Sequence, residues 1–147
     1  MRLKFFSWLL PLMLACSAHA GAREDALLVV QKWAKAFGDA DVDAITALYA
    51  PDALMFGTVD KTLATRPAEI RTYFERALLT GRPRTATLRD HAVAVLSDTV
   101  VVVTGLDTIT ATRDGQVASA NGRVTFVIEK RPAGWQIVHL HRSPVPN

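Results

Sequence analysis

The 147-residue chain carries 17 lysines and arginines against 14 acidic residues, half of its residues are hydrophobic, and it has one cysteine. A single cysteine excludes a fold held together by disulfides within the chain. One domain of ordinary size, stabilised by its hydrophobic core, is therefore expected.

The N-terminal segment predicts a secretory signal peptide over residues 1–20. Two basic residues stand at its start, an apolar run covers residues 5–15, and the Ala-His-Ala sequence of residues 18–20 has the small residues of a cleavage site. The apolar run is too short to span a bilayer comfortably. Cleavage would make Gly21 the first residue of a periplasmic or secreted domain covering residues 21–147.

Cys16 offers an alternative, a lipid anchor, but Met13 and Leu14 before it fit the lipid-attachment pattern poorly. Removal of residues 1–20 takes away two of the 17 basic residues and leaves 15 against 14 acidic ones. A chain so close to neutrality is not expected to bind nucleic acid or an anionic membrane surface.

The rest of the chain predicts helices first and strands after. Apolar residues at helical spacing indicate an amphipathic helix over residues 22–38, and Asp41 is a suitable N-cap for a second helix that ends at Tyr49. A short strand over residues 53–58 precedes a third helix that starts at Pro67. Four long strand-like runs, separated by short turns, predict an antiparallel meander over residues 85–96, 99–112, 116–130 and 135–142. This order of elements indicates an α+β domain whose helices cover one face of a curved sheet.

The last predicted strand has the most informative sequence. Alternation along a strand places one set of side chains on each face, Trp135, Ile137, His139 and His141 on one and Gln136, Val138, Leu140 and Arg142 on the other. A guanidinium on a strand that also reads as core needs a carboxylate, and its planar fork suits a bidentate one. Arg142 is therefore the first candidate for a functional side chain.

Four segments resemble the association (hub) domain of calcium/calmodulin-dependent protein kinase II, which belongs to the nuclear transport factor 2-like superfamily together with SnoaL-like cyclases and ketosteroid isomerases. They are the closing strand from Trp135 to Pro146, the passage 48–54, the helical Tyr73-Phe74-Glu75 and the strand 123–127. The resemblance implies a cone-shaped curved antiparallel sheet wrapped around the N-terminal helices, with a ligand pocket at its open end. Valine and threonine on both faces of the long strands indicate that a partner covers the outer surface of the sheet, so a homodimer is expected, and the resemblance allows a larger ring. No kinase activity is expected, because the kinase and calmodulin-binding segments are absent.

In the hub domains, an arginine at the position of Arg142 and another on the penultimate strand line the pocket. Arg123 matches the second only approximately, and a third arginine of the family has no counterpart here. The resemblance thus implies a small polar or carboxylate ligand held by Arg142, Arg123, Tyr49, His139 and His141. The alternative is structural, with Arg142 and Arg123 paired to Asp107 or Glu129.

Asp107 is the best candidate for catalysis because it lies in an otherwise apolar strand, where burial strengthens a carboxylate as a general base. It supports the runner-up function, a SnoaL-like or ketosteroid-isomerase-like enzyme, against the favoured ligand-binding and self-associating domain. Tyrosine or apolar neighbours would favour catalysis, and a guanidinium would favour structure. His139 and His141 alone are too few for a zinc site, so no metal or cofactor is expected.

Overall fold

The computed structural model describes the backbone of residues 10–146. The elements are α1 (Leu10–Asp39), α2 (Val42–Thr46), β1 (Tyr49–Phe56), α3 (Pro67–Ala77), β2 (Arg84–Ser97), β3 (Val100–Arg113), β4 (Gln116–Arg131) and β5 (Gly134–Pro144). Residues 1–9 of the predicted signal peptide lie outside the described residues, so its cleavage stays a prediction. Within the described part of the chain, no helix is both long and apolar enough to cross a membrane.

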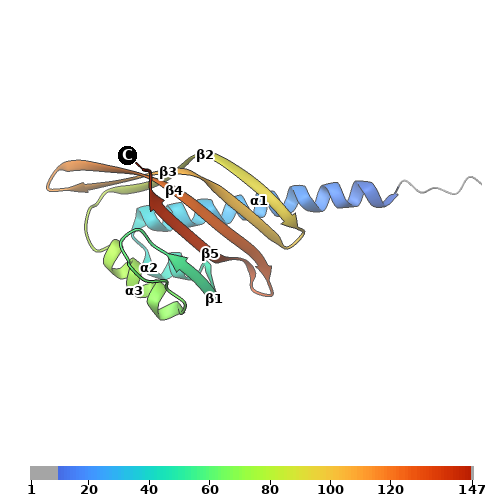
Figure 1. Cartoon of the computed structure of the whole chain (residues 1–147), viewed down its shortest axis with the longest axis horizontal. Coiled ribbons are helices and arrows are strands. Elements are labelled where there is room, and N and C mark those ends of the chain that lie inside the picture. Colours follow the sequence, from blue (N-terminus) through green and yellow to red (C-terminus); the bar gives the residue numbers. More distant parts are fainter. Residues whose placement is uncertain (1–9, 147) are drawn as a thin grey trace, which may run out of the picture.

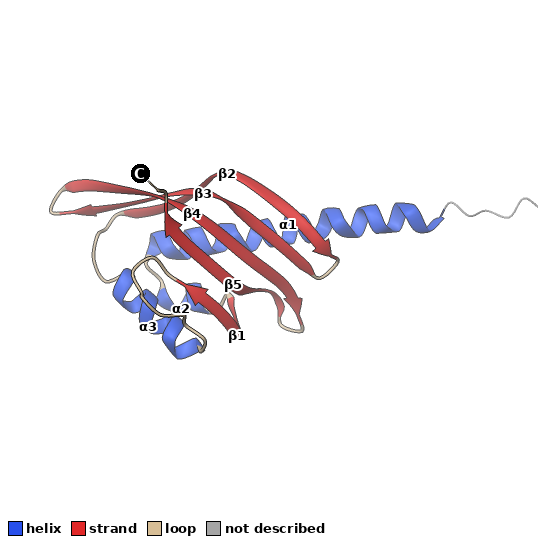
Figure 2. Cartoon of the chain, in the orientation of Figure 1, coloured by secondary structure: helices blue, strands red, loops and turns tan. Residues whose placement is uncertain are grey.

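The five strands form one curved sheet in the order β1-β5-β4-β3-β2, which confirms the α+β prediction (Figure 1). β2, β3, β4 and β5 pair antiparallel with their chain neighbours, as the predicted meander requires. β1 instead joins the edge of the sheet beside β5 and runs parallel to it. Figure 2 shows the long α1 running along the sheet, where it packs against β2, β3, β4 and β5.

The largest differences from the predicted boundaries lie at the starts of α1 and β1. α1 begins at Leu10 rather than at residue 22, because the leucine- and alanine-rich sequence before residue 22 also favours a helix. β1 begins at Tyr49, where a helix was expected to end, and it includes Pro51. Proline is tolerated there because β1 is an edge strand whose register is irregular between Tyr49 and Leu54.

A β-bulge in β5 changes which side chains face the core. Two successive residues of β4 pair with Ile137 and His139, so Val138 is an extra residue in β5. Beyond the bulge, Leu140 and Arg142 share the buried inner face with Ile137, and both histidines of the strand turn to the outer face. The prediction that the histidines share a face with Ile137 is wrong, because strict alternation does not survive an inserted residue.

The hydrophobic core lies between α1 and the inner face of the sheet. Trp33 of α1, only 5% exposed, stacks on Phe37 with ring centroids 5.4 Å apart and meets Phe126 edge-on at 5.5 Å. Trp135 lies at the margin of the core, partly buried, and its indole donates to Asp25 at 3.0 Å. Trp33, rather than Trp135, is therefore the tryptophan at the centre of the core.

Candidate functional site

A cavity of about 540 Å³ opens between α3, the loop after β1 and the end of the sheet where β2 begins. Apolar side chains make up much of its wall, and four arginines stand among them. The lining residues are Phe37, Thr58, Val59, Tyr73, Arg76, Ala77, Thr80, Arg84, Ile109, Ala111, Arg113, Ala120 and Arg142. Among the described residues, this lining contains no aspartate and no glutamate. A cavity of this size and character suits a small organic ligand.

Arg142 of β5 and Asp107 of β3 form a buried bidentate ion pair. Arg142 Nε donates to Asp107 Oδ2 at 2.7 Å and Nη2 donates to Oδ1 at 2.9 Å. The two side chains are 8% and 6% exposed. Nη1 of Arg142 also donates to Thr58 Oγ1 at 3.0 Å. Both oxygens of Asp107 are thus occupied by a guanidinium, the neighbour that favours a structural role over a general base.

The ion pair is accommodated by a glycine. Gly122 of β4 lies opposite Asp107 in the sheet, and a Cβ at this position would lie 2.5 Å from both Asp107 Oδ1 and Arg142 Nη2. No side chain fits there while the pair is in place. The residue type at position 122 is therefore dictated by the charges packed above it.

Tyr73 of α3 places a phenol beside the cavity. Its ring lies against Gly57, where an added Cβ would meet the ring at 2.0 Å. Burial raises the pKa of Tyr73 above the ordinary value of 10.0, while hydrogen bonding with Thr58 and the positive charge of Arg142 act in the opposite direction. Tyr73 is consequently a neutral phenol at physiological pH and can donate or accept a hydrogen bond.

Arg84, at the start of β2, is a buried cation that was not among the residues predicted for the site. It is 5% exposed, and its guanidinium lies 5.5 Å from the Phe37 ring centroid. Its side chain donates to carbonyl oxygens at the end of α3 and in the following loop, those of Ala77, Leu78 and Thr80. Alternation back from Leu88 places Arg84 on the inner face, and this was the available signal.

The other predicted ligand residues do not gather at the cavity. Arg123 is exposed on the outer face, because it neighbours Val124 of the inner face on the same strand. Tyr49 is a core residue whose hydroxyl accepts from Trp33 Nε1 at 3.0 Å, and burial raises the pKa of this hydroxyl. The structure therefore brings Arg142 to the cavity and Asp107 directly behind it, but not Arg123 or Tyr49.

The two histidines of β5 lie on the outer face. His139 is partly buried opposite Leu54, and His141 contacts the Phe56 ring with centroids 5.8 Å apart. Burial, followed by the charge of His141, lowers the pKa of His139 below 6.5, although a hydrogen bond with the Leu54 backbone opposes this. Among the described residues, no group of three or more histidine, cysteine or acidic side chains is arranged to hold a metal ion.

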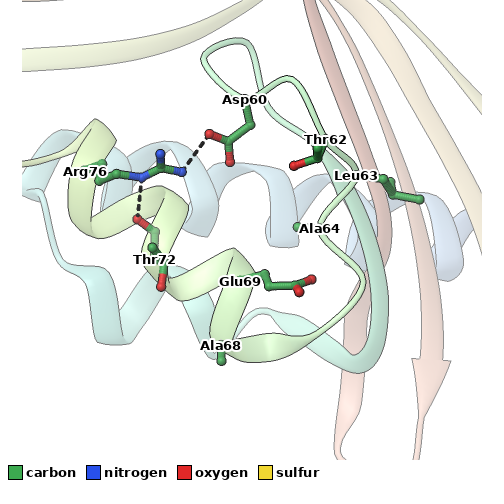
Figure 3. A pocket seen from close by; sticks show the side chains of 8 residues that line it. All are labelled: Asp60, Thr62, Leu63, Ala64, Ala68, Glu69, Thr72 and Arg76. Atoms are coloured by element: carbon green, nitrogen blue, oxygen red, sulfur yellow. Dashed lines mark hydrogen bonds and ion pairs between the residues drawn. The ribbon is translucent and has the colours of Figure 1, made fainter.

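A second hollow of about 420 Å³ lies between α3 and the loop after β1 (Figure 3). Its charged side chains are already partnered by protein groups. Arg76 Nη2 donates to Asp60 Oδ1 at 2.6 Å, and Glu69 accepts from the backbone N–H of Thr65 at 2.8 Å. Arg76 lines both this hollow and the larger cavity. The larger cavity is the better candidate site because its cations are not all neutralised.

A sequence model of the SnoaL-like domain matches residues 27–147. Among solved structures, a proposed calcium/calmodulin dependent protein kinase II association domain from Xanthomonas campestris is 31% identical, with a TM-score of 0.78 over 85% of this chain and 88% of that one. A proposed dehydratase of the nuclear transport factor 2-like family from Streptomyces avermitilis is 16% identical, with a TM-score of 0.78 over 87% and 99% of the two chains.

A proposed scytalone dehydratase from Novosphingobium aromaticivorans shares the fold at 10% identity, with a TM-score of 0.80 over 89% of each chain. No curated protein sequence matches this chain. The relatives therefore agree on the fold and carry different activities in their names, as expected for a fold whose function depends on the residues around its pocket.

Proposed function

We propose that this chain, which belongs to the SnoaL-like domain family, binds a small organic molecule in its cavity and associates with a second copy of itself. The observation that carries the binding function is the cavity of about 540 Å³, whose wall combines apolar side chains with Tyr73 and four arginines. A few polar groups in a mostly apolar concavity are the usual composition of a small-molecule site.

The enzymatic alternative has less support. An isomerase-like reaction would need Asp107 as a base, but both of its carboxylate oxygens accept hydrogen bonds from Arg142. Asp107 also does not line the large cavity. Tyr73 remains as a polar group for orienting a ligand, and orientation alone supports binding rather than proton abstraction.

Self-association is proposed through the outer face of the sheet. Two rows of paired residues cross all five strands there and contain no lysine, arginine, aspartate or glutamate; we call them the outer band. The rows are Leu54, His139, Val127, Val102 and Ala94, and Phe56, His141, Thr125, Thr104 and Ala92. Leu54 and Phe56 are 41% and 40% exposed. An uncharged band on an otherwise charged chain is typical of a protein interface.

The charges beside the outer band favour a second copy as its partner. Along β4, Arg123 lies in the row on one side of the band and Glu129 in the row on the other. A two-fold axis across β4 between Thr125 and Val127 would set Arg123 of one copy opposite Glu129 of the second copy, twice per dimer. The name of the Xanthomonas campestris relative, an association domain, points in the same direction.

Export of the domain to the periplasm or medium is part of the proposal and rests on the N-terminal sequence alone. Cleavage after Ala20 would release a domain that begins at Gly21. Intact-mass analysis of the exported protein should give the mass of residues 21–147. A lipid-modified Cys16 at the N-terminus would contradict this.

The binding function is tested by a thermal-shift screen of small acids, amides and alcohols, since a ligand of the folded state raises the melting temperature. Hits are then measured on Ala111→Leu, which reduces the cavity, and on Ala44→Leu, which adds the same side chain at an exposed position of α2. We expect hits that weaken only with Ala111→Leu. A screen without hits, or hits insensitive to Ala111→Leu, would refute the proposal.

A further inference from the structure

We propose that the ligand of the cavity is a small organic carboxylate with an apolar body, and that its carboxylate is received by Arg84 and Arg113 rather than by Arg142. This rests on the proposed binding function and names its ligand class. The four lining arginines differ in how their charges are neutralised.

Two of the four arginines already have a carboxylate of their own. Arg142 is held by Asp107 through two hydrogen bonds, and Arg76 donates to Asp60 at 2.6 Å. Arg142 also donates through Nη2 to the Ala120 carbonyl, at 3.2 Å, and through Nη1 to the Thr58 hydroxyl. A ligand carboxylate at Arg142 would have to compete with a buried bidentate partner.

Arg84 and Arg113 have no such partner. Within residues 10–146, neither forms an ion pair with an acidic side chain, and the Nε of Arg84 has no hydrogen-bond partner. The carbonyls that Arg84 contacts include those at the negative end of α3, which offset its charge only in part. Arg84 is buried and Arg113 is exposed, and the described residues place no carboxylate against either guanidinium, so an anion bound between them would gain from both charges.

Neighbouring positive charges raise the free-energy cost of burying Arg84 without an anion. The positive charges of Arg82 and Arg113 lie close enough to add to burial in lowering the pKa of Arg84. An anion placed between Arg84 and Arg113 would replace this repulsion with two attractions. Both arginines line the same cavity, so a ligand held there can reach this position.

The rest of the cavity wall defines the body of the ligand. Phe37, Val59, Ile109 and Ala111 are apolar, and Tyr73 adds an aromatic ring with a neutral hydroxyl. Such a wall binds a hydrocarbon or aromatic body, while the two arginines bind the charge. A free inorganic anion would leave the apolar wall unused, and a neutral ligand would leave the two cations unpaired.

The test compares carboxylates with their neutral amides on the full chain: benzoate with benzamide, phenylacetate with phenylacetamide, and hexanoate with hexanamide. Acetate reports the contribution of the charge without the apolar body. Dissociation constants come from chemical-shift titrations of the isotope-labelled protein. We expect each carboxylate to bind at least tenfold more tightly than its amide, and acetate to bind at least tenfold more weakly than the larger carboxylates.

Substitutions of single arginines test whether Arg84 and Arg113 bind the carboxylate of the ligand. Arg113→Gln should weaken the carboxylates at least threefold and leave the amides unchanged, whereas Arg89→Gln, the same change at an exposed position of β2, should leave both unchanged. Arg84→Gln should weaken the carboxylates more than Arg113→Gln does. Because Arg84 also binds the loop after α3, Arg84→Gln can fail to fold, and Arg113→Gln then decides the test by itself. Equal binding of acids and amides, or an unaffected Arg113→Gln, overturns the carboxylate inference alone; no binding of any probe overturns the cavity function as well.

Discussion

Among single residues, Arg142 and Asp107 should behave as one unit in folding. Removing one member leaves the other as an unpaired buried charge, so Asp107→Asn should lower the free energy of unfolding by about 3–5 kcal/mol. The double variant Asp107→Asn with Arg142→Gln should lose much less than the sum of the two single variants, because the two residues share one interaction. Urea denaturation of all four proteins measures this coupling, and additive losses would mean that the pair contributes no joint stability.

Gly122 gives a second test of the same pair. Gly122→Ala adds a Cβ that would lie 2.5 Å from Asp107 Oδ1, so the ion pair must separate or the strands must shift. We expect a loss of stability close to that of Asp107→Asn, measured by urea denaturation. Gly115→Ala at the β3–β4 turn is an unsuitable control because Gly115 has a φ of +75°, so Gly21→Ala, with open space around it, serves instead. A tolerated Gly122→Ala would contradict close packing of the ion pair against Gly122.

His139 should make stability depend on pH. Its folded-state pKa is lowered from 6.5, chiefly by burial, so the unfolded chain takes up a proton at a higher pH than the folded protein. The unfolded state is then favoured as pH falls through about 6.5 and below, and stability should decrease in that direction. The free energy of unfolding at pH 7.5 and 5.5 should differ less in His139→Gln than in the parent. If the difference between the two pH values in His139→Gln equals that of the parent and of the exposed His91→Gln, groups other than His139 cause the pH dependence.

Among the helices and strands, α1 contributes the tryptophan at the centre of the core, and β5 contributes one at its margin. Trp33 is 5% exposed and contacts Phe37 and Phe126, whereas Trp135 lies at the margin of the core. Trp33→Ala should therefore cost about 3–5 kcal/mol in chemical denaturation. Trp135→Ala should cost clearly less, since part of its ring already contacts solvent. The reverse order would place the centre of the core at β5.

The sequence predicted the sheet better than the faces of its strands. The four long runs and their turns are visible as patterns, and so is the Asp41 cap, whose Oδ1 accepts from the Ala44 N–H at 2.9 Å. A bulge leaves no such pattern, because one inserted residue at Val138 changes only which side later residues face. The histidines were therefore placed on the wrong face, although the strand that carries them was predicted correctly.

The site was predictable only where a partner could be guessed from chemistry. A buried arginine needs a carboxylate, which indicated Arg142 and Asp107 as partners in the structural alternative. Alternation back from Leu88 indicated the inner face for Arg84, but no local pattern indicated its hydrogen-bond partners in the loop after α3, which folds back over the start of β2. Arg84 also lay one residue before the predicted strand, which was expected to start at residue 85, so it resembled an ordinary loop residue.

For the molecule as a whole, the exposed outer band should be the surface that a second copy covers. Val127 lies in the middle strand of the band, so Val127→Glu would bury a charge without a partner in the dimer while remaining near solvent in the monomer. Multi-angle light scattering at micromolar concentration should give twice the chain mass for the parent and the chain mass for Val127→Glu. Gln116→Glu, which adds the same charge at the exposed start of β4, should remain dimeric.

The charges beside the band allow a sharper form of this prediction. Exchanging both of them, Arg123→Glu together with Glu129→Arg, restores the proposed contacts between copies, whereas either change alone sets like charges against each other. The double variant should therefore dimerise more tightly than either single variant in sedimentation equilibrium, and the single variants should recover affinity for one another when mixed. A parent that is monomeric at these concentrations would rule out a tight dimer. Dimers equally tight in all the charge variants would show that the band pairs in another orientation or that a different surface is used.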